Sequence, residues 1–284
     1  NTLLAKAVTV EATGTANVSQ AVTMSGFTKD VIYSFSDTAA NTLQNGGPGY
    51  NEAVDITITT DITFALARKV FEASNSGDKI YTINDTATNI TAGISASLGT
   101  INGATTVTAN NAATFAEAAT MSGIAKAISY SISDGQTNIP ASTTATINEA
   151  INITITDAVN FAQAKIIDDG SNSGTNTYSI SDTAANLAAG TVTSVTAING
   201  AQTVTSTTAN ATQAAKLAAI SKVVVYSISD TAANIVANIG GLNESVDITS
   251  TDSCTFAQAK VIEDATNSGD ISYSISDSAA NIVY

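Results

Sequence analysis

The chain has 284 residues and a net charge of −14, with 24 acidic and 10 basic side chains, no His and one Cys. The absence of His removes the commonest general base and metal ligand, and a single Cys excludes a disulfide framework and a thiolate zinc site. The acidic balance argues against binding to nucleic acid or to an anionic membrane, because both need clustered Lys and Arg. We therefore expect no enzymatic activity and no cofactor.

One motif recurs six times along the chain and is the strongest feature of the sequence. Its pattern is Tyr-x-Ile-x-Asp-Thr-Ala-Ala-Asn, with small departures in some copies. The six motif aspartates are Asp37, Asp85, Asp134, Asp182, Asp230 and Asp277, and they lie 48, 49, 48, 48 and 47 residues apart. The six motif tyrosines are Tyr33, Tyr81, Tyr130, Tyr178, Tyr226 and Tyr273. A fixed period of this length is typical of a solenoid or repeat array.

A second motif between these copies shows that two kinds of repeat alternate. Phe64 and Phe161 lie 97 residues apart, and Phe256 follows 95 residues later, whereas the steps through Phe115 are unequal. The alternation predicts a superrepeat of about 96 residues. We expect one repeat domain over residues 1–284, divided into superrepeats at roughly 1–90, 91–187 and 188–284.

The predicted elements of one repeat are clearest between residues 151 and 189. Residues 151–156 alternate apolar and polar side chains, which predicts a half-buried strand. Asp157 stands where an N-cap is needed, and residues 158–167 predict a short amphipathic helix. After a turn rich in Gly, Asn and Ser, residues 177–181 predict a second strand, and Asp182 then caps a helix over residues 183–189.

Each repeat is thus expected to be a strand–helix–strand–helix unit of about 48 residues, with about six such turns in an α/β solenoid. Equivalent strands of successive turns would stack in parallel and form two sheets, because each turn must bury its apolar face against the next. One sheet would collect residues 8–10, 56–58, 106–108, 153–155, 203–205 and 247–249. The other would collect the strands of the six tyrosines, so that these tyrosines form a core and assembly ladder.

The repeated motif resembles the Tyr-x-Ile-x-Asp-Thr-Ala-Ala-Asn repeats of large, acidic bacterial surface proteins, such as repetitive adhesins and matrix or S-layer-like proteins. The resemblance runs through nearly the whole chain. It implies an extracellular or cell-surface location and a structural or adhesive role, and it brings no catalytic residues to this sequence.

The two ends of the sequence suggest how such a protein assembles. Met24 matches Met121, so a shift of 97 places Asn1 on Leu98, whereas Tyr284 aligns with Ala189. The tail therefore stops a few residues short of the phase at which the head begins, and neither end resembles a polar capping repeat. Open strand edges of this kind are templates for another chain. The expected function is a structural subunit that polymerises head to tail with itself into an extracellular filament or surface layer.

Several alternatives remain open on the sequence alone. The chain is also consistent with a repeat fragment of a giant adhesin, in which the next turn is covalent. The six motif aspartates are weak candidates for a calcium ladder, against a simpler role as helix caps. Rows of Thr-x-Thr resemble an ice-binding face, against the simpler interpretation that Thr suits any solvated strand; they comprise Thr57, Thr59, Thr106, Thr108, Thr154, Thr156, Thr203 and Thr205. Cys254 is predicted to be a small buried core residue.

Overall fold

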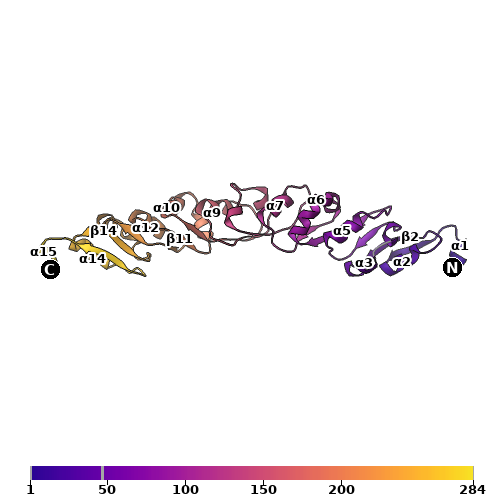
Figure 1. The fold of residues 1–284 in the computed structure, drawn as a ribbon, viewed down its shortest axis with the longest axis horizontal. Helices are drawn as coiled ribbons and strands as arrows, with labels where there is room; N and C mark the ends of the chain where they lie inside the picture. The colour runs from indigo at the N-terminus through magenta and orange to yellow at the C-terminus, as the bar shows by residue number, and fades with distance from the viewer. Residues whose placement is uncertain (1, 46–47, 284) are drawn as a thin grey trace. The chain divides into compact units, whose positions relative to one another are not determined.

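The computed structural model describes residues 2–45 and 48–283, and it is an α/β protein with short parallel sheets and many short helices (Figure 1). By its internal contacts the chain forms two compact units. The first comprises residues 1–132 with 149–151, and the second comprises residues 133–148 with 152–284.

The first unit begins with α1 (Thr2–Lys6), β1 (Glu11–Ala16) and α2 (Val18–Ser25). Its remaining elements are β2 (Ile32–Asp37), α3 (Ala39–Asn45), α4 (Pro48–Asn51), β3 (Ile56–Ile58), α5 (Phe64–Phe71), β4 (Lys79–Ile80), β5 (Ile83–Asp85), α6 (Ala87–Gly103), β6 (Val107–Ala109) and α7 (Phe115–Ser122). The strands form sheets in the orders β1-β2-β3-β4 and β5-β6. Every pair within these sheets is parallel.

The boundary between the two units falls within β7 (Ile132–Asp134), after its first residue. The helices and 3-10 turns of the second unit are η1 (Gln136–Asn138), α8 (Ala145–Asn148), α9 (Phe161–Asp168), α10 (Ala184–Thr193), α11 (Val195–Gly200), α12 (Ala211–Ala218), α13 (Ala232–Ala237), η2 (Ile239–Gly241), α14 (Phe256–Glu263) and α15 (Ala279–Ile282). Its strands are β8 (Ile153–Ile155), β9 (Asn176–Thr177), β10 (Ile180–Asp182), β11 (Val204–Ser206), β12 (Val224–Val225), β13 (Ile228–Asp230), β14 (Ile248–Cys254) and β15 (Ile271–Ile275). The sheet orders are β7-β8-β9, β10-β11-β12 and β13-β14-β15.

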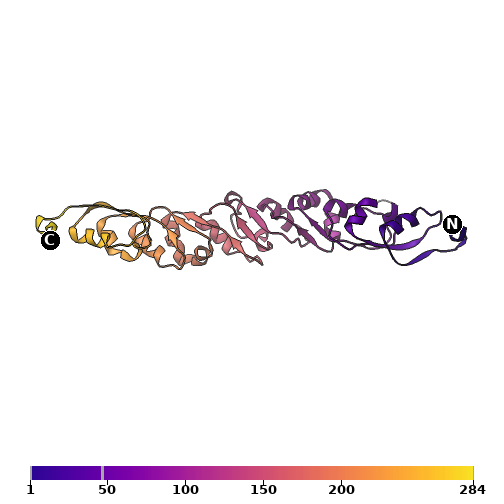
Figure 2. The same cartoon turned by 90° about the horizontal axis from the view of Figure 1, so that it is seen from below.

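The register of these sheets corrects the predicted stacking. Phe35 of β2 pairs with Ile56 of β3, and Ile56 pairs in turn with Lys79 of β4. Strands therefore pair with the next strand of the chain, and the prediction of two separate sheets, each built from equivalent strands of successive repeats, is wrong. The two strand types share one sheet because both present a buried apolar row and a hydrophilic row, and parallel pairing uses only backbone groups. Figure 2 shows the short strands and helices alternating along the chain.

Burial alternates along the strands, so that one face of each sheet is packed and the other faces solvent. In β8, Ile153 and Ile155 are buried whereas Thr154 is exposed. A helix follows most of the strands, and helices also contact later strands, as α9 does with β10. The helices can lie close to the sheet because many of their inward residues are Ala, such as Ala164 and Ala184.

Two helices begin at other N-cap residues than predicted, and one helix was not predicted. The N-cap of α9 is Asn160, which forms a capping box with Gln163, so Asp157 does not cap this helix as predicted. The N-cap of α10 is Thr183, the residue that follows Asp182. An additional helix, α11, follows a break at Ser194.

The same break occurs in the middle of α6. Ser97 has φ −159° and ψ 77° within that helix, and Ser194, the equivalent residue of the next superrepeat, has φ −161° and ψ 64°. The superrepeat predicted from the sequence is therefore visible in backbone geometry.

Candidate functional site

The motif aspartates join each helix to the strand that follows it. Oδ2 of Asp182 accepts a hydrogen bond of 2.8 Å from the backbone N–H of Phe161, the first residue of α9. Oδ1 of the same carboxylate accepts from the backbone N–H of Thr183 and from the side-chain amide of Asn186, at 2.6 and 2.8 Å. A helix start has unsatisfied N–H groups and a partial positive charge, so a carboxylate stabilises it.

The same three bonds recur at other copies of the motif. Asp37, Asp85, Asp230 and Asp277 each accept at Oδ2 from the first amide of an earlier helix, and at Oδ1 from the next residue and from the motif Asn. Asp134 accepts from the Gly135 N–H and from Asn138. The motif Asp thus stabilises the helix that precedes it, and its Asn holds the carboxylate in place.

A second set of side chains does the same for the other helices. The N–H of Ala184 at the start of α10 donates to Oγ1 of Thr207, and the N–H of Ala232 at the start of α13 donates to Oδ1 of Asp252. Asp157 accepts from the N–H of Gln136, which is the role that the structure assigns to it. These helix starts are therefore completed by side chains that lie further along the chain.

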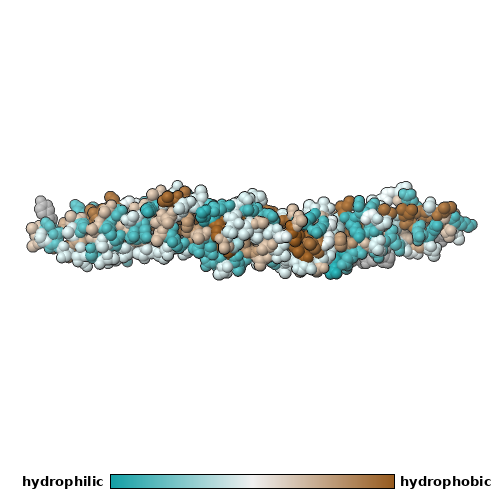
Figure 3. All heavy atoms as spheres, turned by 90° about the horizontal axis from the view of Figure 1, so that it is seen from above, coloured by the Kyte–Doolittle hydropathy of each residue, from teal (hydrophilic) through white to brown (hydrophobic). Residues whose placement is uncertain are grey.

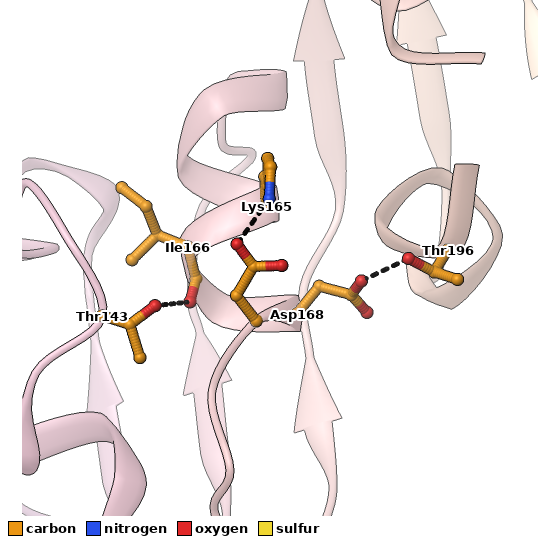
Figure 4. Close-up of polar contacts among 6 residues, drawn as sticks. Thr143, Lys165, Ile166, Asp168 and Thr196 are labelled. Carbon is orange, nitrogen blue, oxygen red and sulfur yellow. Dashed lines mark hydrogen bonds and ion pairs between the residues drawn. The ribbon is translucent and has the colours of Figure 1, made fainter. Parts of the chain in front are cut away.

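Residues of α9 bond to segments that lie before and after this helix in the sequence (Figure 4). The hydroxyl of Thr143 donates to the carbonyl oxygen of Ile166, whereas Asp168 accepts a hydrogen bond of 2.6 Å from the hydroxyl of Thr196. Lys165 forms an ion pair with Asp169 within the same turn. The hydroxyls of Thr143 and Thr196 thus connect α9 to the segments before and after it.

The first five motif tyrosines are buried, with 1–2% of their surface exposed. The hydroxyl of Tyr178 donates to the carbonyl oxygen of Ala197 at 2.8 Å, and that of Tyr81 donates to the carbonyl oxygen of Thr100 at the same distance. In the first sheet β3 lies between β2, which carries Tyr33, and β4, which directly precedes Tyr81, so these two tyrosines do not belong to adjacent strands. They are core residues, and the hydroxyls of Tyr33, Tyr81 and Tyr178 each donate to a carbonyl oxygen of a later helix.

Tyr273 has different surroundings from the other motif tyrosines. It is partly exposed, and its hydroxyl donates to Oε2 of Glu263 at 2.9 Å. Ile275 on the same strand is 43% exposed, whereas its equivalent Ile180 is 1% exposed. The last strand thus carries the side chains of an internal turn without the cover that an internal turn has.

Possible metal ligands do not cluster in the described part of the chain. Within residues 2–45 and 48–283, no group of three or more His, Cys, Asp or Glu side chains could hold a metal ion. None of the helices in this part of the chain is long and apolar enough to span a bilayer. Cys254 is buried, as predicted. On the face shown in Figure 3, hydrophobic residues form separate patches among hydrophilic ones.

The threonine rows lie on the solvent face of the sheets. Thr154, Thr156, Thr203 and Thr205 are exposed, so helices do not cover them. In the register, Thr205 pairs with Ser181 on one side and with Val225 on the other. The rows are therefore mixed rather than purely Thr.

Comparison with known proteins gives no relatives: no family model, no curated protein and no solved structure matches the chain.

Proposed function

We propose that each unit is a segment of an α/β solenoid, and that the protein is a structural subunit of an extracellular filament or surface layer. Copies would join head to tail by adding the first strand and helix of one chain to the last strand of another. The repeat motif, the acidic composition and the absence of His support a structural role over an enzymatic one.

The observation that carries this proposal is one hydrogen bond that recurs at five copies of the motif, from the first amide of a helix to Oδ2 of a motif Asp further along the chain.

The last helix of the second unit is more exposed than its equivalents in the chain. Ile282 of α15 is 50% exposed, whereas its counterparts Leu187 and Ile235 are fully buried. Ala279 is also exposed, whereas Ala184 is 1% exposed. A further repeat, of this chain or of another copy, would bury these groups and pair the free backbone groups of β15.

Strand β1 of the first unit also has one unpaired side. Leu3 and Val8 are 86% and 90% exposed, and β1 pairs with β2 on one side only. The carboxyl-terminal edge of one copy and the amino-terminal edge of another are non-identical surfaces, so a contact between them is heterologous and builds an open chain.

Electron microscopy and sedimentation velocity of the purified 284-residue chain test the proposal. We expect fibres or layers at high protein concentration that dissociate on dilution, since the contacts between copies are non-covalent. A monomer at all concentrations would refute the proposal. Denaturing electrophoresis of native material tests the adhesin alternative: a band near 28.6 kDa supports the polymer, and a band several-fold larger supports covalent repeats.

A further inference from the structure

Side chains that lie later in the chain complete the starts of two successive helices, α5 and α6. The backbone N–H of Ala87, the first residue of α6, donates to Oδ1 of Asn111 at 2.7 Å. Two residues later in α6, the side-chain amide of Asn89 donates to Oδ1 of Asp85 at 2.8 Å. Oδ2 of Asp85 accepts from the N–H of Phe64, the first residue of α5, at 2.9 Å. The first turn of α6 therefore lies between the acceptor at Asn111 and the start of α5.

The same order of donors and acceptors recurs in both units. In the second unit, the N–H of Ala184 in α10 donates to Oγ1 of Thr207. Asn186 of the same helix donates to Asp182, whose carboxylate accepts from the N–H of Phe161 in α9. Two further sets, written from the later acceptor to the earlier helix, are Thr60, Ala39, Asn41, Asp37 and Val18, and Asp252, Ala232, Asn234, Asp230 and Ala211. The arrangement is thus a property of the repeat.

The side chain of Asn89 couples the two bonds. It reaches Asp85 from the first turn of α6, so it keeps this position only while that turn is helical. The bond from Ala87 to Asn111 helps to hold the turn, because the first N–H groups of a helix have no acceptor inside it. Without the Asn111 acceptor, Asn89 holds the carboxylate less firmly, and the carboxylate is less well placed for the first N–H of α5.

Helix α5 depends on this carboxylate more than its counterpart α9 depends on Asp182. Its N-cap Thr63 makes no side-chain hydrogen bond to the helix, whereas Asn160 and Gln163 form a capping box at the start of α9. Asp85 is 6% exposed, so water replaces its bonds poorly. A change in the later segment should therefore have a large effect at the start of α5.

We propose a relay in which the Asn111 acceptor stabilises the start of α5, 47 residues earlier in the chain, through the first turn of α6 and Asp85. The relay makes neighbouring helices open together, so that loosening of one segment is passed to the helix before it. Such coupling is a free energy shared between two sites, and in a repeat array it adds to the interaction between neighbouring repeats. The relay lies within one chain, so it does not depend on assembly of copies.

Direct packing between the two helices is the competing explanation for coupling. A Cβ at Gly93 of α6 would lie 2.5 Å from the ring of Phe64, so the two helices are also in contact apart from the relay. The two explanations differ in the role of Asn89, because packing of Phe64 on Gly93 does not require that side chain. Removal of the Asn89 side chain therefore separates them.

Hydrogen exchange resolved at single amides tests the relay. We expect Asn111→Ala to speed exchange about fivefold at the start of α6, the effect of one lost hydrogen bond, and about twofold at the start of α5. Asn110→Ala is the matched control, because its side chain is exposed and lies outside the relay, and it should leave both helices unchanged. In an Asn89→Ala background, Asn111→Ala should still speed exchange in α6 but should add nothing at the start of α5.

Two results would overturn the relay. One is unchanged exchange at the start of α5 in Asn111→Ala, although α6 loosens; the other is equal acceleration of α5 with and without the Asn89 side chain, which would favour helix packing. Circular dichroism would confirm that each variant folds. If Asn89→Ala does not fold, Thr207→Val with its neighbour Thr208→Val as the control repeats the test in the second unit, where unchanged exchange at the start of α9 would likewise count against the relay.

Discussion

The backbone N–H of Phe161 donates to Oδ2 of Asp182, so the start of one helix is completed by the strand that follows it. Because the bond recurs throughout the chain, the stability of each helix depends on the adjacent turn. Local unfolding of a turn should consequently weaken the turn before it.

We predict that Asp85→Ala lowers the free energy of unfolding by about 2–3 kcal/mol, since it removes a charged acceptor and leaves three donors without their partner. Asp85 is 6% exposed, and its partners are the N–H groups of Phe64 and Thr86 and the side chain of Asn89. The matched control is Asp277→Ala, which removes the same three bonds where they are exposed and water replaces them. Urea denaturation followed by circular dichroism measures both. Equal losses of stability in the two variants would contradict a role for burial.

Acid should destabilise the fold. Burial raises the pKa of Asp37, but hydrogen bonds from Val18, Asn41 and Thr38 outweigh it and hold the pKa below its ordinary value. The pKa of Asp230 is lowered in the same way. A lowered pKa in the folded state means that the stabilisation is complete above the unfolded value of about 3.9 and disappears as the pH falls through the folded value.

We therefore expect the melting temperature to be nearly constant from about pH 7 to 5 and to fall steeply below about pH 4. Thermal unfolding at a series of pH values measures this directly. A melting temperature that rises on acidification below this range would show that relief of the negative net charge dominates instead.

Alkaline solution should also unfold the protein. Burial raises the pKa of Tyr81 and Tyr226 to about 12. An unfolded Tyr ionises near pH 10, so the stabilisation is present below that pH and is lost as the pH rises toward 12. We expect tyrosinate absorbance and loss of circular dichroism to appear together in this interval. Full ionisation near pH 10 with an intact fold would contradict the burial of these side chains.

Gly190 should be sensitive to a single added methyl group. A Cβ at this position would lie 2.6 Å from the ring of Phe161, so we expect Gly190→Ala to destabilise the protein by about 1–3 kcal/mol. Gly240→Ala is the control, because the nearest atom there is 3.9 Å away. Adding Phe161→Leu to Gly190→Ala should restore part of the loss. Chemical denaturation curves of these variants would decide; an unchanged midpoint in Gly190→Ala would rule out the contact.

The sequence by itself determined the α/β content and the superrepeat, because alternating polarity and a fixed period report local geometry and packing directly. It predicted burial of all six motif tyrosines, and the first five are buried whereas Tyr273 is partly exposed. Only the tertiary structure decided that Phe35 pairs with Ile56, which belongs to a strand of the other type. Backbone hydrogen bonds in a parallel sheet do not distinguish side chains, so chemical similarity between the strands of successive repeats carries no information on which strands are neighbours. For the same reason the partner of Asp182 proved to be the amide of Phe161: a helix start accepts any carboxylate within reach, and reach is set by the folded chain.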